Sequence, residues 1–321
     1  MSSAANATAT AIAPAFQTLS FDLRPVPPFR LDLAVWTLRR RPENILDRWD
    51  GKTYRRALPL NNEVVEIAGH QNGGPAHPRL IVNVLAKHFP PGAEPSLRAV
   101  VERTLGTRID LSDFYAFASR QKHLKLLVTS FAGFKPPRYP TVFEALLNAI
   151  SCQQVSLHVG IMLLNRLVQT FGRPASADPS VHACPSPVDI AGIAPGTLHA
   201  MGFSRQKERA LLELSRAVAE NKLDIESFAE LDDTVALEHL TAIRGVGRWS
   251  AEYTLLRGLG RLNVFPGDDV GGWNKLQKHL RLRKRPDYEK TRKLLAPWKT
   301  YAGLIYFHFL LDGLRDRGVI S

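Results

Sequence analysis

The sequence predicts an α+β fold: a mostly helical body preceded by a small domain built on an antiparallel sheet. Residues 17–113 hold short runs in which apolar and polar residues alternate, as in half-buried strands. After a proline-rich segment at 135–140, apolar residues recur at helical spacing. The chain has 321 residues, of which 45% are hydrophobic, enough for two or three cores. We expect a flexible tail at 1–16, a sheet-containing domain at 17–113 and helical domains at 114–321.

The elements of the first domain follow from local patterns. Leu19, Phe21 and Leu23 alternate with polar residues, which indicates a strand. The stretch 31–40 instead has apolar residues at helical spacing, and 70–78 is rich in glycine and proline, as in a loop. Four strands are expected, at residues 18–26, 53–60, 63–69 and 79–89.

The helical body contains several amphipathic stretches. Apolar stripes run from Phe143 to Ile150 and from Leu157 to Val168, and Gly172 is placed to end the second helix. Residues 173–189 read as a loop. Two further helices are expected: an amphipathic one at 204–220 with Ser204 as N-cap, and a buried one at 301–314.

Charge and cysteine content narrow the function classes. The formal net charge is +12 and the pI about 9.9, which favours nucleic acid first and an anionic membrane second as partner. A basic protein without such a partner is the alternative. Cys152 and Cys184 are the only cysteines, too few for a disulfide scaffold, a four-thiolate zinc site or an iron–sulfur cluster. No apolar run approaches the roughly 18–20 residues of a membrane span. We expect no membrane partner and an intracellular location, in the cytoplasm or nucleoid, or in the nucleus of a eukaryote.

One stretch, "LTAIRGVGRWSAEYTLLRGLGRLNVFPGDDVG", carries the strongest functional signal. Glycines on either side of Val246 permit a tight hairpin between two helices, with close approach of another molecule to the backbone. Amides at the start of the second helix, helped by its dipole, can bind a phosphate. An ordinary helix–helix corner is the alternative. The hairpin predicts a contact with the DNA backbone through Arg244, Gly245, Val246, Gly247 and Arg248.

This stretch resembles the helix-hairpin-helix signature of the DNA glycosylase superfamily, and most of all the 3-methyladenine DNA glycosylase II (AlkA) type. The segments "FEALLNAISCQQVS", "APWKTYAG" and "RPVPPF" are similar to further parts of that family, so the resemblance covers most of residues 20–310. It implies a helical glycosylase body with the active-site cleft between helical subdomains. The residues that match the hairpin motif are Leu240, Ile243, Gly245, Val246, Gly247, Trp249, Ser250, Ala251, Tyr253, Asp268 and Asp269.

The resemblance implies that Asp269 is the catalytic residue. Cleavage of an N-glycosidic bond puts positive charge on the sugar, which a nearby carboxylate stabilises while it positions water. The alternative is that Asp268 and Asp269 only cap the helix that follows. We expect one role for each residue, with Asp268 as the cap.

A base removed from a duplex must first leave the base stack and enter a pocket. Trp249 and Tyr253, four residues apart on one helix face, and Trp298 and Tyr301 are the expected walls, because aromatic faces attract electron-poor alkylated bases. Core packing is the alternative for these aromatics. Val270 stands where relatives often carry an aromatic residue, which changes one wall.

Three further expectations rest on the resemblance. Gln154 aligns with the residue that fills the gap left by the extruded base, although it could equally be structural, as we expect for its neighbour Gln153. Trp249 stands where bifunctional relatives hold a Schiff-base lysine, so we expect no AP lyase activity. Backbone carbonyls of Thr241, Ile243 and Val246 are expected to hold a structural Na⁺ or K⁺, and no other cofactor is required.

The sequence therefore predicts a monomeric, monofunctional DNA glycosylase that acts on double-stranded DNA. It would release alkylated purines of the 3-methyladenine and 7-methylguanine type and leave an abasic site. The basic segment 274–285 could follow the DNA backbone or simply face solvent. Two alternatives remain open: a non-catalytic hairpin protein that binds DNA or senses lesions, and a glycosylase for oxidised or deaminated bases.

Overall fold

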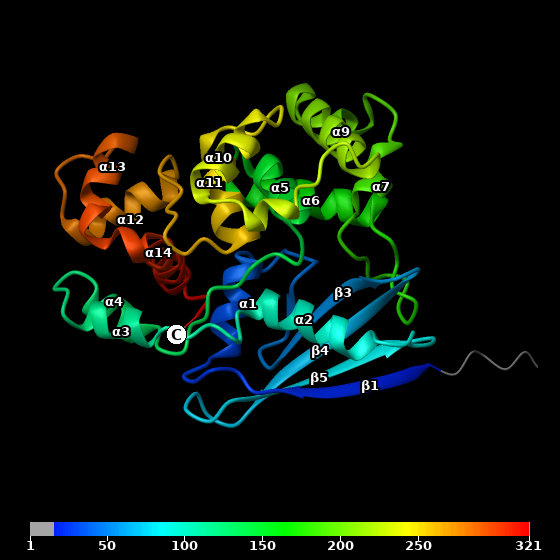
Figure 1. Cartoon of the computed structure of the whole chain (residues 1–321), viewed down its shortest axis with the longest axis horizontal. Coiled ribbons are helices and arrows are strands. Elements are labelled where there is room, and N and C mark those ends of the chain that lie inside the picture. Colours follow the sequence, from blue (N-terminus) through cyan, green and yellow to red (C-terminus); the bar gives the residue numbers. More distant parts are fainter. Residues whose placement is uncertain (1–15, 321) are drawn as a thin grey trace, which may run out of the picture.

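The computed structural model of the protein describes residues 16–320, so the predicted tail lies outside it except for Phe16. The expected α+β architecture is confirmed: an antiparallel five-stranded sheet is joined to a helical body (Figure 1). None of the helices within this range combines the length and the apolar character needed to cross a membrane.

The sheet has the strand order β1-β5-β4-β3-β2, and every neighbouring pair is antiparallel. Its apolar face packs against α1 (Leu31–Arg39) and α2 (Ala93–Leu105), which lie between the sheet and the rest of the helices (Figure 1). The strands are β1 (Gln17–Leu23), β2 (Arg48–Trp49), β3 (Thr53–Leu60), β4 (Glu63–Asn72) and β5 (Arg79–Ala86). Strand β4 takes up the first three residues of the predicted loop at 70–78, because His70, Gln71 and Asn72 continue its pairing with β5.

The helices between residues 142 and 259 form one group, and their buried apolar side chains pack into a common core. Side-chain caps fix three of its starts, with Thr141, Ser156 and Ser204 each accepting a backbone amide in the first turn. The predicted cap of the 204–220 helix is thus confirmed. The elements are α5 (Val142–Cys152), α6 (Leu157–Phe171), α7 (Pro187–Ala191), α8 (Thr197–Ala200), α9 (Arg205–Ala219), η1 (Ser227–Glu230), α10 (Asp233–Ala242), α11 (Arg248–Thr254) and η2 (Leu255–Leu259).

A second group surrounds α14 (Ala302–Asp316), which is buried over most of its length as its all-round apolar sequence predicts. Short helices from before α5 and helices from the C-terminal third share this core, although they are far apart in the sequence (Figure 1). The other members are α3 (Ser112–Ser119), α4 (Lys125–Ser130), α12 (Val270–Leu280), α13 (Tyr288–Leu295) and η3 (Ala296–Tyr301).

A buried ion cluster fastens the sheet to the first helical group. Arg56 of β3 donates from Nη1 to Asp47 at 2.6 Å and from Nη2 to Glu144 of α5 at 2.6 Å. All three side chains are nearly inaccessible to solvent. Removal of one partner would leave a buried charge uncompensated, so the cluster holds the two parts in one orientation.

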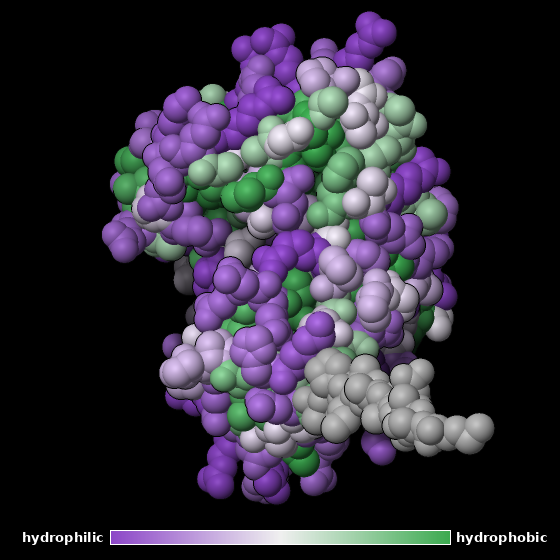
Figure 2. All heavy atoms as spheres, turned by 90° about the vertical axis from the view of Figure 1, so that its right-hand side faces the viewer, coloured by the Kyte–Doolittle hydropathy of each residue, from purple (hydrophilic) through white to green (hydrophobic). Residues whose placement is uncertain are grey.

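Figure 2 shows the face of the molecule that lies on the right-hand side of Figure 1. Hydrophilic side chains cover much of this face, and a hydrophobic strip lies in its upper, helical half.

Candidate active site

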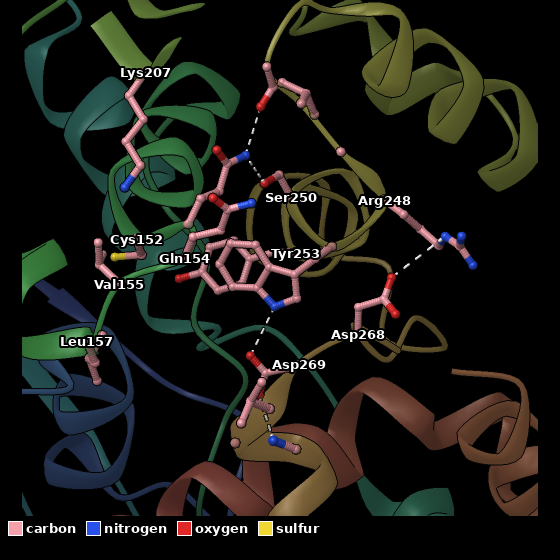
Figure 3. A pocket seen from close by; sticks show the side chains of 18 of the residues that line it. Cys152, Gln154, Val155, Leu157, Lys207, Arg248, Ser250, Tyr253, Asp268 and Asp269 are labelled. Atoms are coloured by element: carbon pink, nitrogen blue, oxygen red, sulfur yellow. Dashed lines mark hydrogen bonds and ion pairs between the residues drawn. The ribbon is translucent and has the colours of Figure 1, made fainter. Parts of the chain in front are cut away.

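A cavity of about 1290 Å³ opens between the two helical groups. Its walls come from the α5–α6 turn, the start of α9, the α10–α11 hairpin, the first turn of α12 and α14, and Arg40 after α1 adds a residue from the sheet-containing part. Figure 3 shows its centre with Gln154, Tyr253 and Asp269, and Trp249 Nε1 bonds to Asp269 there. The cavity exceeds the roughly 300–1,000 Å³ of most small-molecule pockets, and one nucleotide would occupy only part of it.

The hairpin between α10 and α11 has the conformation that its glycines suggest. Gly245 has φ +79°, and a Cβ there would come within 2.5 Å of the Cβ of Ala210. Gln153 donates from Nε2 to the Gly245 carbonyl at 2.8 Å and to Ser250 Oγ at 2.6 Å (Figure 3). Gln153 therefore holds the hairpin to α5, which gives it the structural role expected for it.

The amides of the hairpin are not all free, which corrects one expectation. The Val246 amide donates to the Ile243 carbonyl at 3.0 Å and closes the turn. Gly247 and Arg248 are exposed, and no side chain caps the start of α11. The amides that are left for a phosphate are thus those from Gly247 onward. Both hairpin arginines have carboxylate partners: Arg244 lies 2.7 Å from Glu213, and Arg248 lies 3.7 Å from Asp268.

Asp269 has two roles in one side chain. Its Oδ1 accepts a 3.0 Å hydrogen bond from Trp249 Nε1, and its Oδ2 accepts a 2.6 Å bond from the Gly272 amide, which makes it the N-cap of α12. The expectation that Asp268 is the cap is wrong, since Asp268 turns to Arg248 instead (Figure 3). Burial raises the pKa of Asp269, and the bonds from Gly272 and Trp249 oppose this shift.

Trp249 and Tyr253 form one aromatic wall of the cavity. Their rings stack with centroids 5.3 Å apart and planes 27° apart. The Tyr253 hydroxyl lies 2.8 Å from that of Tyr139 and accepts a 3.0 Å bond from Arg40 Nη1. Hydrogen bonds at both ends of this pair fix the plane of the indole next to Asp269.

Trp298 and Tyr301 do not line the cavity, which corrects the expectation for both. Trp298 is buried in the core around α14, and its Nε1 lies 3.4 Å from Gln121 Oε1. Tyr301 packs against Phe114 and Phe117 of α3, with ring centroids 5.3 and 5.0 Å away. The η3 turn directs both rings towards α3, so core packing, the alternative, applies to them.

Gln154 lies in the turn between α5 and α6, at the rim of the cavity. It is exposed and has φ +51°, a conformation that few residues other than glycine adopt. Val155, next to it, is 39% exposed although apolar. A strained turn that presents two side chains at the mouth of a cavity suits insertion into a base stack, the role predicted for Gln154.

Several residues that shape the site carry no recognisable signal in the sequence. Arg40 lies in a run of three arginines in which no pattern distinguishes a buried member, and Tyr306 was part of a helix expected only to be buried. Glu252 accepts bonds from the Gly267 amide at 2.7 Å and from Tyr288 at 2.8 Å, and so holds the loop before Asp269 against α11. The sequence signal that could have placed Glu252 near the site is its position on the same helix as Trp249 and Tyr253.

In the basic segment 274–285, the lysines of α12 pair with carboxylates of the protein, whereas the charges after α12 face solvent. Lys275 and Lys278, on α12, pair with carboxylates of α14: Lys275 with Asp312 and Asp316, each at 2.7 Å, and Lys278 with Asp316 at 3.0 Å. The positive charges beyond α12, at 281 and 283–285, are exposed. Only this outer part is free to meet a phosphate backbone.

The chain is similar in sequence to known DNA repair proteins. The HhH-GPD superfamily, described as base excision DNA repair proteins, matches residues 147–300. A DNA-3-methyladenine glycosylase of Bacillus subtilis is 27% identical over 62% of this chain and 66% of its own length. A second B. subtilis protein, provisionally named a DNA-3-methyladenine glycosylase, is 29% identical over 86% of this chain and 92% of its own length.

The fold has a close counterpart among solved structures. A 3-methyladenine DNA glycosylase from Archaeoglobus fulgidus superposes with a TM-score of 0.80 over 94% of this chain and all of its own, at 23% identity. The likeness extends over the sheet as well as the helical body, beyond the residues that match the superfamily. The hairpin and the Asp269 loop lie within residues 147–300, so the match to the HhH-GPD superfamily of base excision DNA repair proteins covers the segments that carry the candidate site.

Proposed function

We propose that this protein is a monofunctional DNA glycosylase that releases alkylated purines of the 3-methyladenine and 7-methylguanine type from double-stranded DNA. The observation that carries the proposal is the position of Asp269, whose carboxylate lies in the cavity beside the stacked pair of Trp249 and Tyr253. The names of the two relatives from B. subtilis support the class of substrate.

The geometry suits hydrolysis of an N-glycosidic bond. Because two donors hold Asp269 in place, its negative charge is available next to the aromatic wall without any rearrangement. A base stacked on Trp249 would bring its sugar towards this carboxylate. As the C1′–N bond breaks, the electron pair leaves with the base, and Asp269 stabilises the positive charge on the sugar until water bonds to C1′.

DNA would be held from the hairpin side of the cavity. The exposed start of α11 offers amides to one phosphate, while Arg244 and Arg248 would exchange their carboxylate partners for the backbone. The net charge of +12 supports a polyanionic partner. Since one chain supplies every wall of the cavity, we propose that the protein acts as a monomer.

The absence of AP lyase activity is part of the proposal. Trp249 occupies the position of the Schiff-base lysine, and the two lysines at the cavity wall are engaged elsewhere. Lys207 donates to the Ser151 carbonyl at 2.9 Å, and Lys275 pairs with Asp312. Partial burial lowers the pKa of Lys207, so Lys207 is the amine to test for covalent trapping.

A monovalent cation at the hairpin also remains a proposal. The carbonyls of Thr241 and Ile243 lie at the end of α10, beyond which the helical hydrogen bonds stop. The Ile243 carbonyl accepts one bond, from the Val246 amide, and keeps a second lone pair. With Val246 they offer a set of oxygens that fits Na⁺ or K⁺. The cation would join the negative end of α10 to a DNA phosphate.

The decisive experiment incubates the protein with methylated duplex DNA and identifies both the free bases and any nicked strand. The proposal requires release of 3-methyladenine or 7-methylguanine, an intact strand until alkali is added, and no borohydride-trapped adduct. Binding without release would favour the lesion-sensing alternative. A trapped adduct that disappears in Lys207→Gln would show that the enzyme is bifunctional.

A further inference from the structure

Arg40 is a buried cation at the wall of the base pocket that has no carboxylate partner. It is 6% exposed and has φ +58°, so the chain holds it in an unfavourable backbone conformation. Its Nη1 donates to the Tyr253 hydroxyl at 3.0 Å and its Nη2 to Asn148 Oδ1, whereas its buried Nε has no partner among residues 16–320. Its hydrogen-bond partners in the described part of the chain are therefore all neutral groups.

A second buried guanidinium, that of Arg257, lies near the same tyrosine, although Arg257 does not itself line the cavity. Its Cζ is 5.6 Å from the ring centroid of Tyr253 and 5.0 Å from that of Tyr139. It donates to the Thr37 carbonyl at 2.9 Å and makes no ion pair within the described part of the chain. The other fully buried arginine, Arg56, has two carboxylate partners, so unpaired burial is particular to the pair beside Tyr253.

Two buried charges without an ion-pair partner lower the stability of the folded protein, which suggests that they have a function. One use is to keep Asp269 ionised: burial raises the pKa of Asp269, and the charge of Arg40 opposes this shift. Another concerns the base itself. Arg40 lines the same cavity and donates to Tyr253 of its aromatic wall, so a base stacked on that wall would lie near its charge.

The charge of the departing base differs between lesions. When the C1′–N bond of a neutral base breaks, the electron pair stays on the base, which leaves as an anion and later takes a proton from water. A cationic base such as 7-methylguanine takes up the same pair and leaves neutral. A fixed positive charge beside the base therefore lowers the barrier for a neutral lesion, whereas it only repels a cationic one in the ground state.

We propose that Arg40, reinforced by Arg257, is a specificity-determining residue that favours neutral lesions whose base departs as an anion. This inference rests on the proposed glycosylase activity and assigns the choice between neutral and cationic damaged purines to one side chain, with hypoxanthine as the neutral probe. The sheet-containing part of the chain thus contributes to substrate choice, because Arg40 follows the helix that packs on that sheet.

The test compares two duplexes of one sequence, with a single hypoxanthine or a single 7-methylguanine, under single-turnover conditions. The variants are Arg40→Gln, which removes the charge, and Arg40→Lys, which keeps it. Arg41→Gln is the matched control, since Arg41 lies next along the chain but pairs with Glu43 outside the cavity. Melting curves confirm that each variant folds.

The expected result for Arg40→Gln is a loss of hypoxanthine release at least about tenfold larger than any loss of 7-methylguanine release. Arg40→Lys and Arg41→Gln should keep the wild-type ratio of the two rates. Equal losses for both bases, or no change, would overturn the inference and leave Arg40 as a support for Tyr253 or Asp269. If Arg40→Gln does not fold, a changed ratio in Arg40→Lys would contradict it.

The wild-type protein separates this inference from the function on which it rests. Release of both bases is the expected result. Release of 7-methylguanine alone would refute the preference for neutral lesions and leave the glycosylase assignment intact. Release of neither base would overturn both.

Discussion

The indole nitrogen of Trp249 donates a 3.0 Å hydrogen bond to the Asp269 carboxylate, and this bond joins the hairpin to the loop before α12. The residue that offers the base a stacking surface thus also orients the residue that meets the sugar. Because the other Asp269 oxygen accepts the Gly272 amide, the carboxylate has no freedom to turn away. This relationship makes the two side chains dependent on each other in a testable way.

Trp249→Phe should keep an aromatic surface against Tyr253 and remove the donor. We expect base release to fall about 10- to 100-fold. Loss of the bond should raise the pKa of Asp269 further, since the bond lowers it. The acid limb of the pH–rate profile, where activity rises as Asp269 loses its proton, should therefore move to higher pH. A profile that keeps its shape while the rate falls would show that the bond does not act through the carboxylate.

Asp269→Asn should change how the stability of the folded protein depends on pH. Asparagine can still cap α12 through its oxygen and the buried charge is gone, but its amide nitrogen then faces the Trp249 donor. The folded-state pKa of Asp269 is raised, so the stability linked to its proton is fully present below the unfolded pKa and is lost as pH rises through the folded pKa. The stability of the variant relative to the wild type should therefore fall on acidification, by on the order of 1 kcal/mol. Melting temperatures of both proteins from neutral to acidic pH measure this difference. A difference that is independent of pH would contradict the linkage.

Two glycines of the hairpin should respond differently to alanine. Gly245→Ala combines a positive φ with a Cβ 2.5 Å from Ala210, so the free energy of unfolding should fall by about 1–3 kcal/mol. A Cβ at Gly247 meets nothing within 4 Å, so Gly247→Ala should fold normally. If a phosphate approaches the start of α11, Gly247→Ala should nevertheless bind DNA more weakly. Unchanged DNA affinity in a folded Gly247→Ala protein would exclude that approach.

Gln154→Ala should lower base release most where extrusion is hardest. A lesion in a fully paired duplex needs the gap to be filled, whereas the same lesion opposite a mismatch is already partly unstacked. We expect a loss of about tenfold for the paired site and a smaller one at the mismatch. Equal losses at both sites would assign Gln154 a role in the turn rather than in the DNA.

Sequence patterns were sufficient for elements whose stability is local. The alternation of β1 and β5, the Ser204 cap and the all-round apolar α14 appear as expected, because each depends on neighbouring residues. The hairpin and Asp269 could be placed through the family motif. Helix α2, which the sequence did not indicate, begins at a glycine in a left-handed conformation and has no side-chain cap.

Contacts between distant segments could not be derived from local pattern. The family resemblance predicts Trp298 and Tyr301 in the pocket, yet η3 points them at α3 and at Gln121 after it, more than 170 residues earlier in the chain. Arg40 bonds to Tyr253, which is 213 residues away in the sequence, and the spacing of apolar residues cannot predict such a contact. Even the split between Asp268 and Asp269 depended on the path of one turn, which put the cap on the residue nearer to Gly272.

The catalytic role of Asp269 is tested most sharply by single-turnover release of 7-methylguanine by Asp269→Asn, with Asp268→Asn as the matched control and DNA affinity measured for both. Asp269→Asn should lose release by at least about a thousandfold and bind DNA as the wild type does, while Asp268→Asn should keep release within about threefold. Base release that survives in Asp269→Asn, or that is lost equally in both variants, would contradict a catalytic role of Asp269.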